Sequence, residues 1–429
     1  MKRILAAAAV SALILSSCGQ SSRIEALRAE NEALKAEKHT LELALKAYVE
    51  QIDVIYKLPR EPRLVKQPPV LFTDMVLCYG GSPSRGALGV WDKERFSASV
   101  TYTDPEGKEK WLYDGFLAIE PRLWGRPSGD PENVALAGED MGGMEMSGHK
   151  EHWKELIDYW MAPGNGFHAL EEAVADAASR LGEPPYKRKV VMNLPDAVLH
   201  EYFEILDSRT AYWGELDGRE LDFAVPEDRA AACKWYIDTM NEAFKAAGFK
   251  YIEIIGYYIH SEEIPTPTRG WRWGWKKLDV YLPMVSDYLH SKGQYLTWIP
   301  YREAASYDRT GELGIDYTWM QPNYYWEGDR YPWDESMKMI MQNGLGMEFE
   351  FDDRLLESSP ESAEQRRRFY LYIDYAKRSG LYGTRSFTYF QDTDTMRNLL
   401  RSDNPSDRKV YDDLCSFVAD NPLRKKVKR

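Results

Sequence analysis

Cysteine is scarce in this chain of 429 residues, which has only four: Cys18, Cys78, Cys233 and Cys415. So sparse a set does not make a disulfide framework, and no Cys or His spacing matches that of a zinc site. Cys78 lies in an apolar, strand-like run, where we expect it to be buried and unreactive. The sequence therefore predicts neither a structural metal nor a cofactor.

Positive charge is also in short supply, since 55 Lys and Arg face 68 Asp and Glu and leave a net charge of −13. This acidity argues against a nucleic acid as partner, because binding to phosphates needs a basic surface. Residues 424–429 are an exception, and we expect them to form a solvated basic tail. Residues 141–152 carry Met and His of the kind that bind copper, but their Gly-rich setting favours a rim loop.

The apolar run 4–15 is too short to span a bilayer and follows a basic Met1-Lys2-Arg3, so residues 1–17 are predicted to be a signal peptide. Its end, Leu15-Ser16-Ser17-Cys18, resembles a lipobox, which implies cleavage before Cys18 and lipidation of its thiol. A plain secretory signal is the alternative. No acidic retention signal follows Cys18, so we expect a lipid anchor in the bacterial outer membrane, on its periplasmic or its surface face.

Residues 24–55 lack Gly and Pro and follow a heptad pattern. Its a series is Ile24, Asn31, Lys38, Leu45 and Ile52, and its d series is Leu27, Leu34, Leu41, Tyr48 and Ile55. The pattern predicts a coiled-coil stalk within residues 18–57 that could join two copies as a homodimer. A single solvated helix acting as a spacer is the alternative. A Pro-rich linker, 58–70, ends the stalk.

Residues 71–423 contain no linker-like stretch, which predicts one large domain. Helical patterns at 166–181, 229–247, 276–292, 336–343 and 361–379 separate eight apolar segments with strand character: 75–81, 114–121, 189–195, 251–260, 295–301, 317–325, 346–352 and 385–390. The fold class is therefore α/β, a (β/α)₈ TIM barrel preceded by the α-helical stalk. A doubly wound sheet is the alternative fold. It would need a Gly-rich turn that opens a helix after the first strand, and Gly80-Gly81-Ser82-Pro83 does not open a helix in that way. Residues 91–102 suggest an added hairpin.

Acidic residues follow two of these strands. In residues 346–353, Glu348, Glu350 and Asp352 share one face, which in a barrel strand faces inward. Glu262 follows the fourth strand and is predicted to be the general acid/base, whereas Glu263 points elsewhere. Glu350, nearer the mouth, is the predicted nucleophile. Glu348 lies roughly 6.6 Å deeper, where it would position Tyr301 or Arg302.

Aromatic side chains with polar neighbours gather at the same strand ends, as sugar binding requires, and the chain has 14 Trp and 28 Tyr. Most of these rings are expected to pack between barrel and helices, but not Tyr324, Tyr325 and Trp326. The predicted substrate-binding residues are Asp114, Tyr258, Trp298, Tyr301, Arg302, Gln321, Asn323, Tyr324, Trp326 and Asp352.

Five motifs together resemble the bacterial domain of unknown function 4855 over about residues 72–420. They are Tyr113-Asp114-Gly115-Phe116-Leu117, Ile255-Gly256-Tyr257-Tyr258 with Glu262, Trp298-Ile299-Pro300-Tyr301, Gln321-Pro322-Asn323-Tyr324, and Gly346-Met347-Glu348-Phe349-Glu350-Phe351. The resemblance implies an extracytoplasmic, glycosidase-like barrel with acids at Glu262, Glu348 and Glu350. The positions of Glu262 and Glu350 are also similar to those in the largest clan of retaining barrel glycosidases. That clan usually has Asn before the strand-four Glu, where this chain has Ser261.

The sequence thus predicts a glycoside hydrolase that acts on a polysaccharide or oligosaccharide with two carboxylates. Two alternatives remain: a non-catalytic carbohydrate-binding barrel, and a scaffold that acts through its coiled coil. The enzyme hypothesis expects Glu262 and Glu350 to converge in one open cleft.

Overall fold

The computed structural model describes residues 27–32, 34, 35, 38, 69–126, 132–137, 147–197, 213–264, 278–392 and 394–427. The chain divides into two compact units, Met1–Glu61 and Pro62–Arg429. In the first unit the described residues are helical, and the d-series residues Leu27 and Leu34 are 57% and 58% exposed. The signal peptide, Cys18, most of the heptads and the linker lie outside the described residues, so the stalk stays a prediction.

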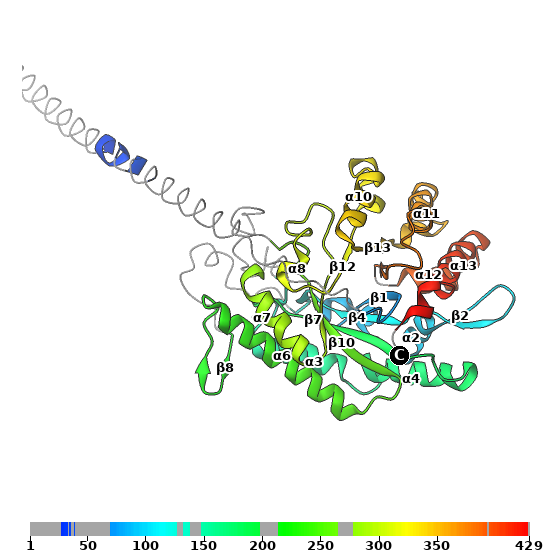
Figure 1. Ribbon diagram of the computed structural model, residues 1–429, viewed down its shortest axis with the longest axis horizontal. Coiled ribbons are helices and arrows are strands. Elements are labelled where there is room, and N and C mark those ends of the chain that lie inside the picture. The colour runs from blue at the N-terminus through cyan, green and yellow to red at the C-terminus, as the bar shows by residue number, and fades with distance from the viewer. Residues whose placement is uncertain are drawn as a thin grey trace, which may run out of the picture. The chain divides into compact units, whose positions relative to one another are not determined.

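The second unit is a closed barrel of eight parallel strands, as predicted (Figure 1). In chain order the strands are β1 (Asp74–Tyr79), β4 (Gly115–Ile119), β7 (Arg188–Leu194), β10 (Ile252–Ile259), β11 (Tyr295–Trp298), β12 (Tyr317–Met320), β13 (Gly346–Glu350) and β14 (Phe387–Phe390). Each strand pairs with the next in chain order, and β14 pairs with β1 to close the ring. All eight carboxyl ends therefore lie at one end of the barrel, which we call the mouth.

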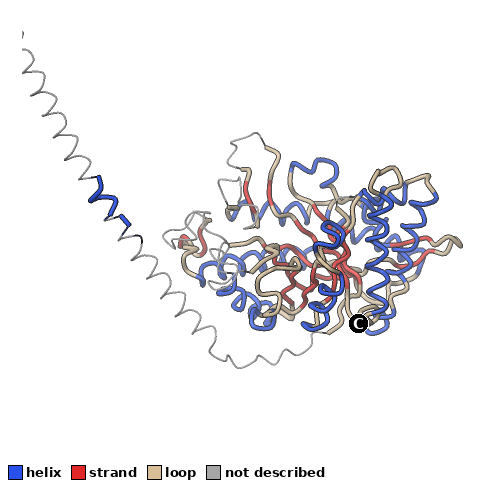
Figure 2. The backbone as a smooth tube through the Cα atoms, turned by 90° about the horizontal axis from the view of Figure 1, so that it is seen from above, coloured by secondary structure: helices blue, strands red, loops and turns tan. Residues whose placement is uncertain are grey.

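Helices surround the strands, which gather at the centre of the unit (Figure 2). In the described part of this unit, the α-helices of at least seven residues are α2 (Lys93–Val100), α3 (Lys150–Trp160), α4 (Gly166–Leu181), α6 (Pro226–Ala247), α7 (Leu278–Ser291), α10 (Trp333–Asn343), α11 (Ser362–Arg378), α12 (Thr395–Arg401) and α13 (Pro405–Ala419). Short helices α8 (Thr310–Leu313) and α9 (Tyr324–Glu327) follow β11 and β12. The five predicted helical patterns correspond to α4, α6, α7, α10 and α11.

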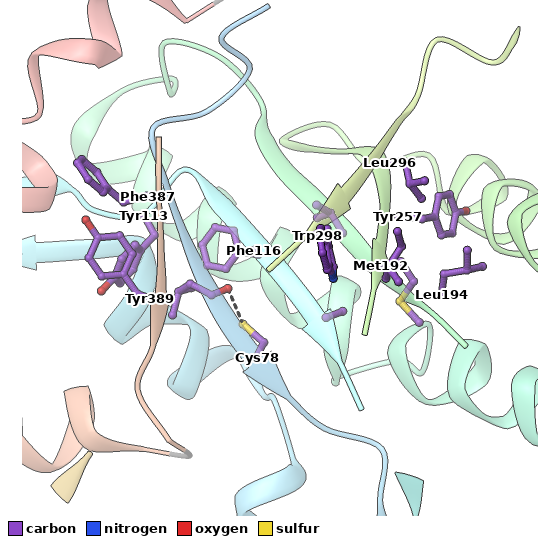
Figure 3. Close-up of a cluster of buried hydrophobic side chains, with 14 of the residues drawn as sticks. Cys78, Tyr113, Phe116, Met192, Leu194, Tyr257, Leu296, Trp298, Phe387 and Tyr389 are labelled. Carbon is purple, nitrogen blue, oxygen red and sulfur yellow. Dashed lines mark hydrogen bonds between the residues drawn. The ribbon is translucent and has the colours of Figure 1, made fainter. Parts of the chain in front are cut away.

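Alternation along each strand separates two buried apolar layers. The outer layer packs the barrel against its helices and includes Cys78, Phe116 and Tyr257, which Figure 3 shows with their neighbours. The inner layer fills the barrel and includes Met75, Leu117 and Trp319 among its members. Burial raises the pKa of Cys78, which is 1% exposed, in accord with the unreactive thiol expected.

The end of the barrel opposite the mouth is closed by the chain segment that enters β1. The Tyr317 hydroxyl donates to the carbonyl of Pro69 (2.6 Å), and the Phe72 ring lies 5.6 Å from that of Trp319. The carboxyl-terminal turn η6 (Pro422–Lys426) packs at the same end, where the Asn421 amide donates to Asp74 Oδ2 (3.0 Å). The chain thus enters and leaves the described barrel at its closed end.

The hairpin expected at residues 91–102 is wrong in its first part. Helix α2 begins there, because the Asp92 carboxylate accepts from the Arg95 N–H (2.8 Å) and so caps the first turn. Phe96 and Val100, one turn apart, bury the same face of the helix. A hairpin of β2 (Thr101–Thr103) and β3 (Glu109–Trp111) follows this helix.

The solvated tail expected at residues 424–429 is wrong for Arg424 and Val427, whereas Lys425 and Lys426 are exposed. The Arg424 guanidinium donates to the carbonyl of Val418 (3.2 Å) and to that of Leu112, and the Val427 side chain is 7% exposed. Three of the basic residues belong to η6. The guanidinium folds back because backbone carbonyls at the closed end accept its N–H groups.

The His residues of the Met- and His-containing segment have structural partners. His152 Nδ1 accepts from the His149 N–H (3.0 Å) before α3, and His152 Nε2 lies 3.0 Å from Glu132 Oε2. Residues 141–146 lie outside the described residues. Within the described ranges, no group of three or more His, Cys, Asp or Glu could hold a metal ion. The helices described there are also too short or too polar to cross a membrane.

Candidate active site

Two acidic residues meet at the mouth from strands four and seven of the barrel. Glu350 is the last residue of β13, and Glu262 follows β10 by three positions. Glu348 lies two positions before Glu350 on the same inward face, opposite Thr388 of β14. The parallel barrel therefore brings these acids to one end of the molecule, where such folds carry their active sites.

Three donors surround the Glu350 carboxylate. The Trp326 Nε1–H donates to Oε1 (2.8 Å), the Tyr372 hydroxyl donates to Oε2 (2.5 Å), and the Asn323 amide lies 3.4 Å from Oε1. Only 1% of Glu350 is exposed. Such a set of donors suits an ionised carboxylate, which accepts hydrogen bonds and donates none.

Burial nevertheless raises the pKa of Glu350 from 4.5 to about 8, because it outweighs the lowering by Tyr372 and Trp326. The negative charge of Glu262 adds to the rise. Burial, with the charges of Glu350 and Glu262, raises the pKa of Glu348 well above its ordinary value. The Thr388 hydroxyl donates to Glu348 Oε1 (3.4 Å) and opposes this rise only weakly. The carboxyl groups of Glu348 and Glu350 thus interact in a dry region beside Glu262, which disfavours the ionisation of both at once.

Glu262 is half-buried and better placed to meet a ligand than Glu350. Its Oε1 accepts from the Gln321 Nε2 (2.9 Å), and that amide also lies 3.4 Å from the Ile299 carbonyl. The neighbouring Glu263 carboxylate accepts from the Ala305 N–H (3.2 Å). The two adjacent glutamates therefore have different partners, and Gln321 belongs to the Glu262 side of the site.

The turn after β12 fixes the Asn323 side chain. Asn323 adopts a positive φ of 55°, a conformation that Asn tolerates better than most residues. Its Oδ1 accepts from the Arg302 N–H (3.0 Å), which leaves its amide nitrogen directed at Glu350. The backbone of one mouth loop therefore orients a donor on the next.

The family described as domain of unknown function DUF4855 matches residues 74–416. The chain belongs to this family. No curated protein matches the sequence. Among solved structures, one described as the crystal structure of CbXyn10B in native form is 12% identical, with a TM-score of 0.33, over 76% of this chain and 86% of that one.

In this DUF4855 barrel, Asp114 does not lie at the mouth, so the prediction that it binds substrate is wrong. It precedes β4 and therefore stands at the closed end, with none of its surface exposed. Its carboxylate accepts from the N–H groups of Thr73 (3.0 Å) and Asp74 (2.9 Å) and from the Tyr186 hydroxyl (2.6 Å). Asp114 thus ties β1 to β4 and is remote from Glu350.

Trp298 is likewise not placed to bind a substrate. Its ring lies in the outer layer, with none of its surface exposed, and its Nε1–H donates to the Ser261 carbonyl (2.6 Å). Because inward and outward positions alternate, Thr297 and Ile299 face inward and Trp298 must face the helices. Its hydrogen bond still matters to the site, since it holds the residue that precedes Glu262.

Two aromatic residues expected to be free of the outer layer are packed in it. Tyr324 is 5% exposed and its ring meets that of Trp333 at 5.5 Å, while Tyr325 is fully buried. Trp326, which is half-buried, is the residue of α9 whose ring extends to Glu350. The reason is that α9 is a short helix, so consecutive side chains point in different directions.

Arg302 does not reach Glu348. Its Nη2 lies 2.6 Å from Glu335 Oε2, and its guanidinium stacks over the Tyr331 ring at 4.9 Å. Arg302 therefore anchors α10 rather than an acid of the lumen, so the prediction that Glu348 positions it is wrong.

The remaining predicted residues lie around the mouth or in the lumen. Tyr258 is a member of the inner layer, 3% exposed, and Tyr301 pairs through its backbone with Gln321. The Asp352 carboxylate accepts from Arg354 Nε (2.9 Å) and from the Tyr325 hydroxyl (3.0 Å). An ion pair with Arg354 thus offsets the charge of Asp352.

The sequence did not single out Tyr79, Arg85 or Phe390, which lie at the mouth. The rings of Tyr79 and Trp326 each meet the Phe390 ring edge-on, at 5.9 and 5.8 Å, and all three are half-buried. Arg85 lies over the Tyr79 ring at 4.8 Å and binds Glu120, the residue after β4, at 2.5 Å. Positions at the ends of β1 and β14 could have indicated the first and last of these rings.

Proposed function

We propose that this protein is a glycoside hydrolase in which Glu262 is the general acid/base and Glu350 the nucleophile. The observation that supports this proposal is the placement of two acids at the same end of the barrel. Glu350 ends the seventh strand and accepts from three donors, and Glu262 follows the fourth strand and accepts from the amide of Gln321. The polar and aromatic side chains around them suit the hydroxyls and C–H faces of a sugar.

In the proposed reaction, Glu262 gives its proton to the glycosidic oxygen while Glu350 attacks the anomeric carbon. The bond to the leaving sugar breaks with its electron pair, and an ester joins the glycosyl unit to Glu350. Glu262, now ionised, then takes a proton from water, and the resulting hydroxide displaces Glu350 from the sugar. The product keeps the configuration of the substrate, and both acids return to their starting states.

The covered position of Glu350 sets a condition on this reaction. We had expected an open cleft, but Glu350 is 1% exposed beneath the indole of Trp326 and the amide of Asn323. A sugar reaches the carboxylate only when Trp326 turns aside. The same burial favours a second candidate function, a barrel that binds glycans at its mouth without cleaving them.

A panel of polysaccharides, assayed for released reducing ends, tests the first proposal. Glu262→Gln and Glu350→Gln should each lower turnover by at least about a hundredfold, because each removes a group that transfers a proton or forms a bond. Glu263→Gln is the matched control, since that residue neighbours Glu262 but binds the Ala305 N–H. Nuclear magnetic resonance of the first product should show the retained anomer.

A Glu350→Gln variant that folds and cleaves like the wild type would rule out the nucleophile role. Binding of a glycan by the wild type without release of reducing ends, retained in the Glu262→Gln variant, would support the second candidate instead. Circular dichroism and thermal unfolding of each variant separate loss of catalysis from loss of fold.

We also propose that the protein is held at the bacterial cell envelope by a lipid on Cys18, with residues 24–55 as a stalk between lipid and barrel. The lipobox-like sequence and the heptads support this arrangement. Metabolic labelling with a fatty acid should mark the wild type and not Cys18→Ser. Cross-linking through a cysteine placed at a heptad a position should reveal a dimer, whereas a stalk of one helix would give none.

A further inference from the structure

An exposed tryptophan stands on the mouth of the barrel, away from the acids. Trp124 follows β4 and Glu120, and 41% of it is exposed. The flat face of an exposed indole on a mouth loop can stack on the C–H face of a sugar ring.

The backbone of Trp124 is held firmly against the loop after β1. Its carbonyl accepts from the Ser84 N–H (2.6 Å) and from the Ser82 hydroxyl (3.1 Å), and its N–H donates to the same hydroxyl (2.9 Å). A side chain on the next residue, Gly125, would come within 2.5 Å of the Ser84 nitrogen, so the two loops are in close contact. The indole is therefore exposed on a fixed support, which lowers the entropy cost of binding.

The order of the strands places the loop that carries Trp124 opposite helix α9, which carries Trp326. The Trp326 ring itself extends from α9 to Glu350 of β13 and Phe390 of β14. In the ring of eight strands, β4 and β12 are four positions apart in either direction and so lie opposite each other. Trp124 follows β4, and Trp326 follows β12. A line between the carboxyl ends of β4 and β12 leaves β13, with Glu350, on one side and β10, with Glu262, on the other.

A continuous set of contacts joins Trp124 to the acids. Ser82, which binds the Trp124 backbone, also donates through its N–H to Glu120 Oε2 (3.2 Å), and Glu120 pairs with Arg85. Arg85 lies over the ring of Tyr79. The Tyr79 ring meets that of Phe390 at 5.9 Å, and Phe390 in turn meets the ring of Trp326, which donates to Glu350. Polar and aromatic groups thus line the way from Trp124 to the centre.

We infer that Trp124 is an outer sugar-binding platform, and that the substrate is a linear chain of several sugar units that extends across the mouth from the acids to Trp124. This inference rests on the proposed function. Sugar rings at one end of the bound chain stack on the exposed indole, several units away from the scissile bond between Glu262 and Glu350.

The test uses the full-length protein and the oligosaccharides of two to six units of whichever polysaccharide the wild type cleaves. Trp124→Ala should raise KM for the longest oligomer by about tenfold, the size of one aromatic contact, and leave kcat and the shortest oligomer unchanged. Trp124→Phe, which keeps a ring, should recover part of the loss. Met341→Ala, at a residue 50% exposed on α10, is the matched control.

Equal kinetics of Trp124→Ala and wild type on long and short oligomers would overturn the inference, as would an equal loss on both. Affinity electrophoresis in hydroxyethyl cellulose, arabinoxylan, galactomannan and dextran separates this result from failure of the proposed function. If the wild type is retarded without releasing reducing ends, and Trp124→Ala is not retarded, the platform stands and hydrolysis fails. A wild type that neither binds nor cleaves any of these chains would overturn both.

Discussion

The indole N–H of Trp326 donates a hydrogen bond of 2.8 Å to Oε1 of Glu350, the last residue of the seventh barrel strand. This single contact couples two properties of the site. The donor favours the ionised form of the carboxylate, and the same ring covers it. Any change at Trp326 should therefore alter both the charge and the access of Glu350.

Replacing Trp326 with Phe keeps a ring but removes the donor. Because the Trp326 hydrogen bond lowers the pKa of Glu350, its loss should raise that pKa further above 8. The acidic limb of the kcat/KM profile should move to higher pH, and kcat near neutral pH should fall by about tenfold or more. Hydrolysis of an aryl glycoside between pH 5 and pH 10 measures both effects. A profile that matches the wild type would show that Glu350 does not need this donor.

Stability should fall as pH rises, owing to the buried acids. The pKa of Glu350 is about 8 in the folded state against 4.5 for the free side chain, so between these values the folded protein binds more protons than the unfolded chain. The free energy of unfolding should decrease across that window, by on the order of 4 kcal/mol for Glu350 alone. Urea unfolding at pH 5 and at pH 8.5 measures the difference.

Glu350→Gln is the control for this pH dependence, because an amide does not titrate. The variant should lose much of the slope between pH 4.5 and about 8, the window set by the shift of Glu350. Glu348→Gln should flatten it as well, since the pKa of Glu348 is also raised. If the unfolding free energy of the wild type rose with pH across this window, the raised pKa values of Glu348 and Glu350 would be contradicted.

Asp114 should matter for stability and not for the chemistry of the mouth. Asp114→Asn places an N–H among the donors of Thr73, Asp74 and Tyr186, which should cost about 3 kcal/mol of unfolding free energy. Activity per folded molecule should be unchanged. Asp403→Asn, at an exposed position, serves as the control in thermal and urea unfolding. A specific loss of kcat in a stable Asp114→Asn protein would return this residue to the active site.

Gly346, the first residue of β13, leaves space for a tryptophan in the lumen. A Cβ there would lie 2.2 Å from Trp319 Cδ1 and 2.7 Å from the Ser386 carbonyl. Gly346→Ala should therefore lower the free energy of unfolding by about 1–3 kcal/mol through overpacking of the inner layer. Urea unfolding tests this at pH 5, where the buried acids are protonated. No loss of stability would mean that Trp319 can move aside without cost.

Much of the barrel was predictable because its strands show their period in the sequence. Glu348 and Glu350 alternate with Met347 and Phe349, and the structure indeed places the two apolar residues in the outer layer. The same parity would have placed Trp298 outward, and strand direction would have placed Asp114 at the closed end. The error at Asp114 came from treating a residue before a strand as one at its carboxyl end, whereas Trp298 does end its strand but faces outward.

Other features had no local signal. Tyr372 lies in the middle of α11, yet its hydroxyl contacts Glu350 because the helix packs over β13. Nothing in the helix sequence distinguishes it from Tyr370 or Tyr375, since only tertiary packing selects which hydroxyl meets the acid. Helix α2, by contrast, had a signal in the cap at Asp92, which its flanking aromatic residues obscured.

The closed end of the barrel decides how the protein can be handled. Pro69 and Asn421 both have their partners there, so the chain enters and leaves the barrel on the side away from Glu262 and Glu350. A bead, a surface or a fused protein joined upstream of Pro69 or after Val427 would therefore be attached at the closed end of the barrel. Long, insoluble chains could then still reach the mouth, which makes the immobilised barrel a suitable reagent for capturing its own substrate.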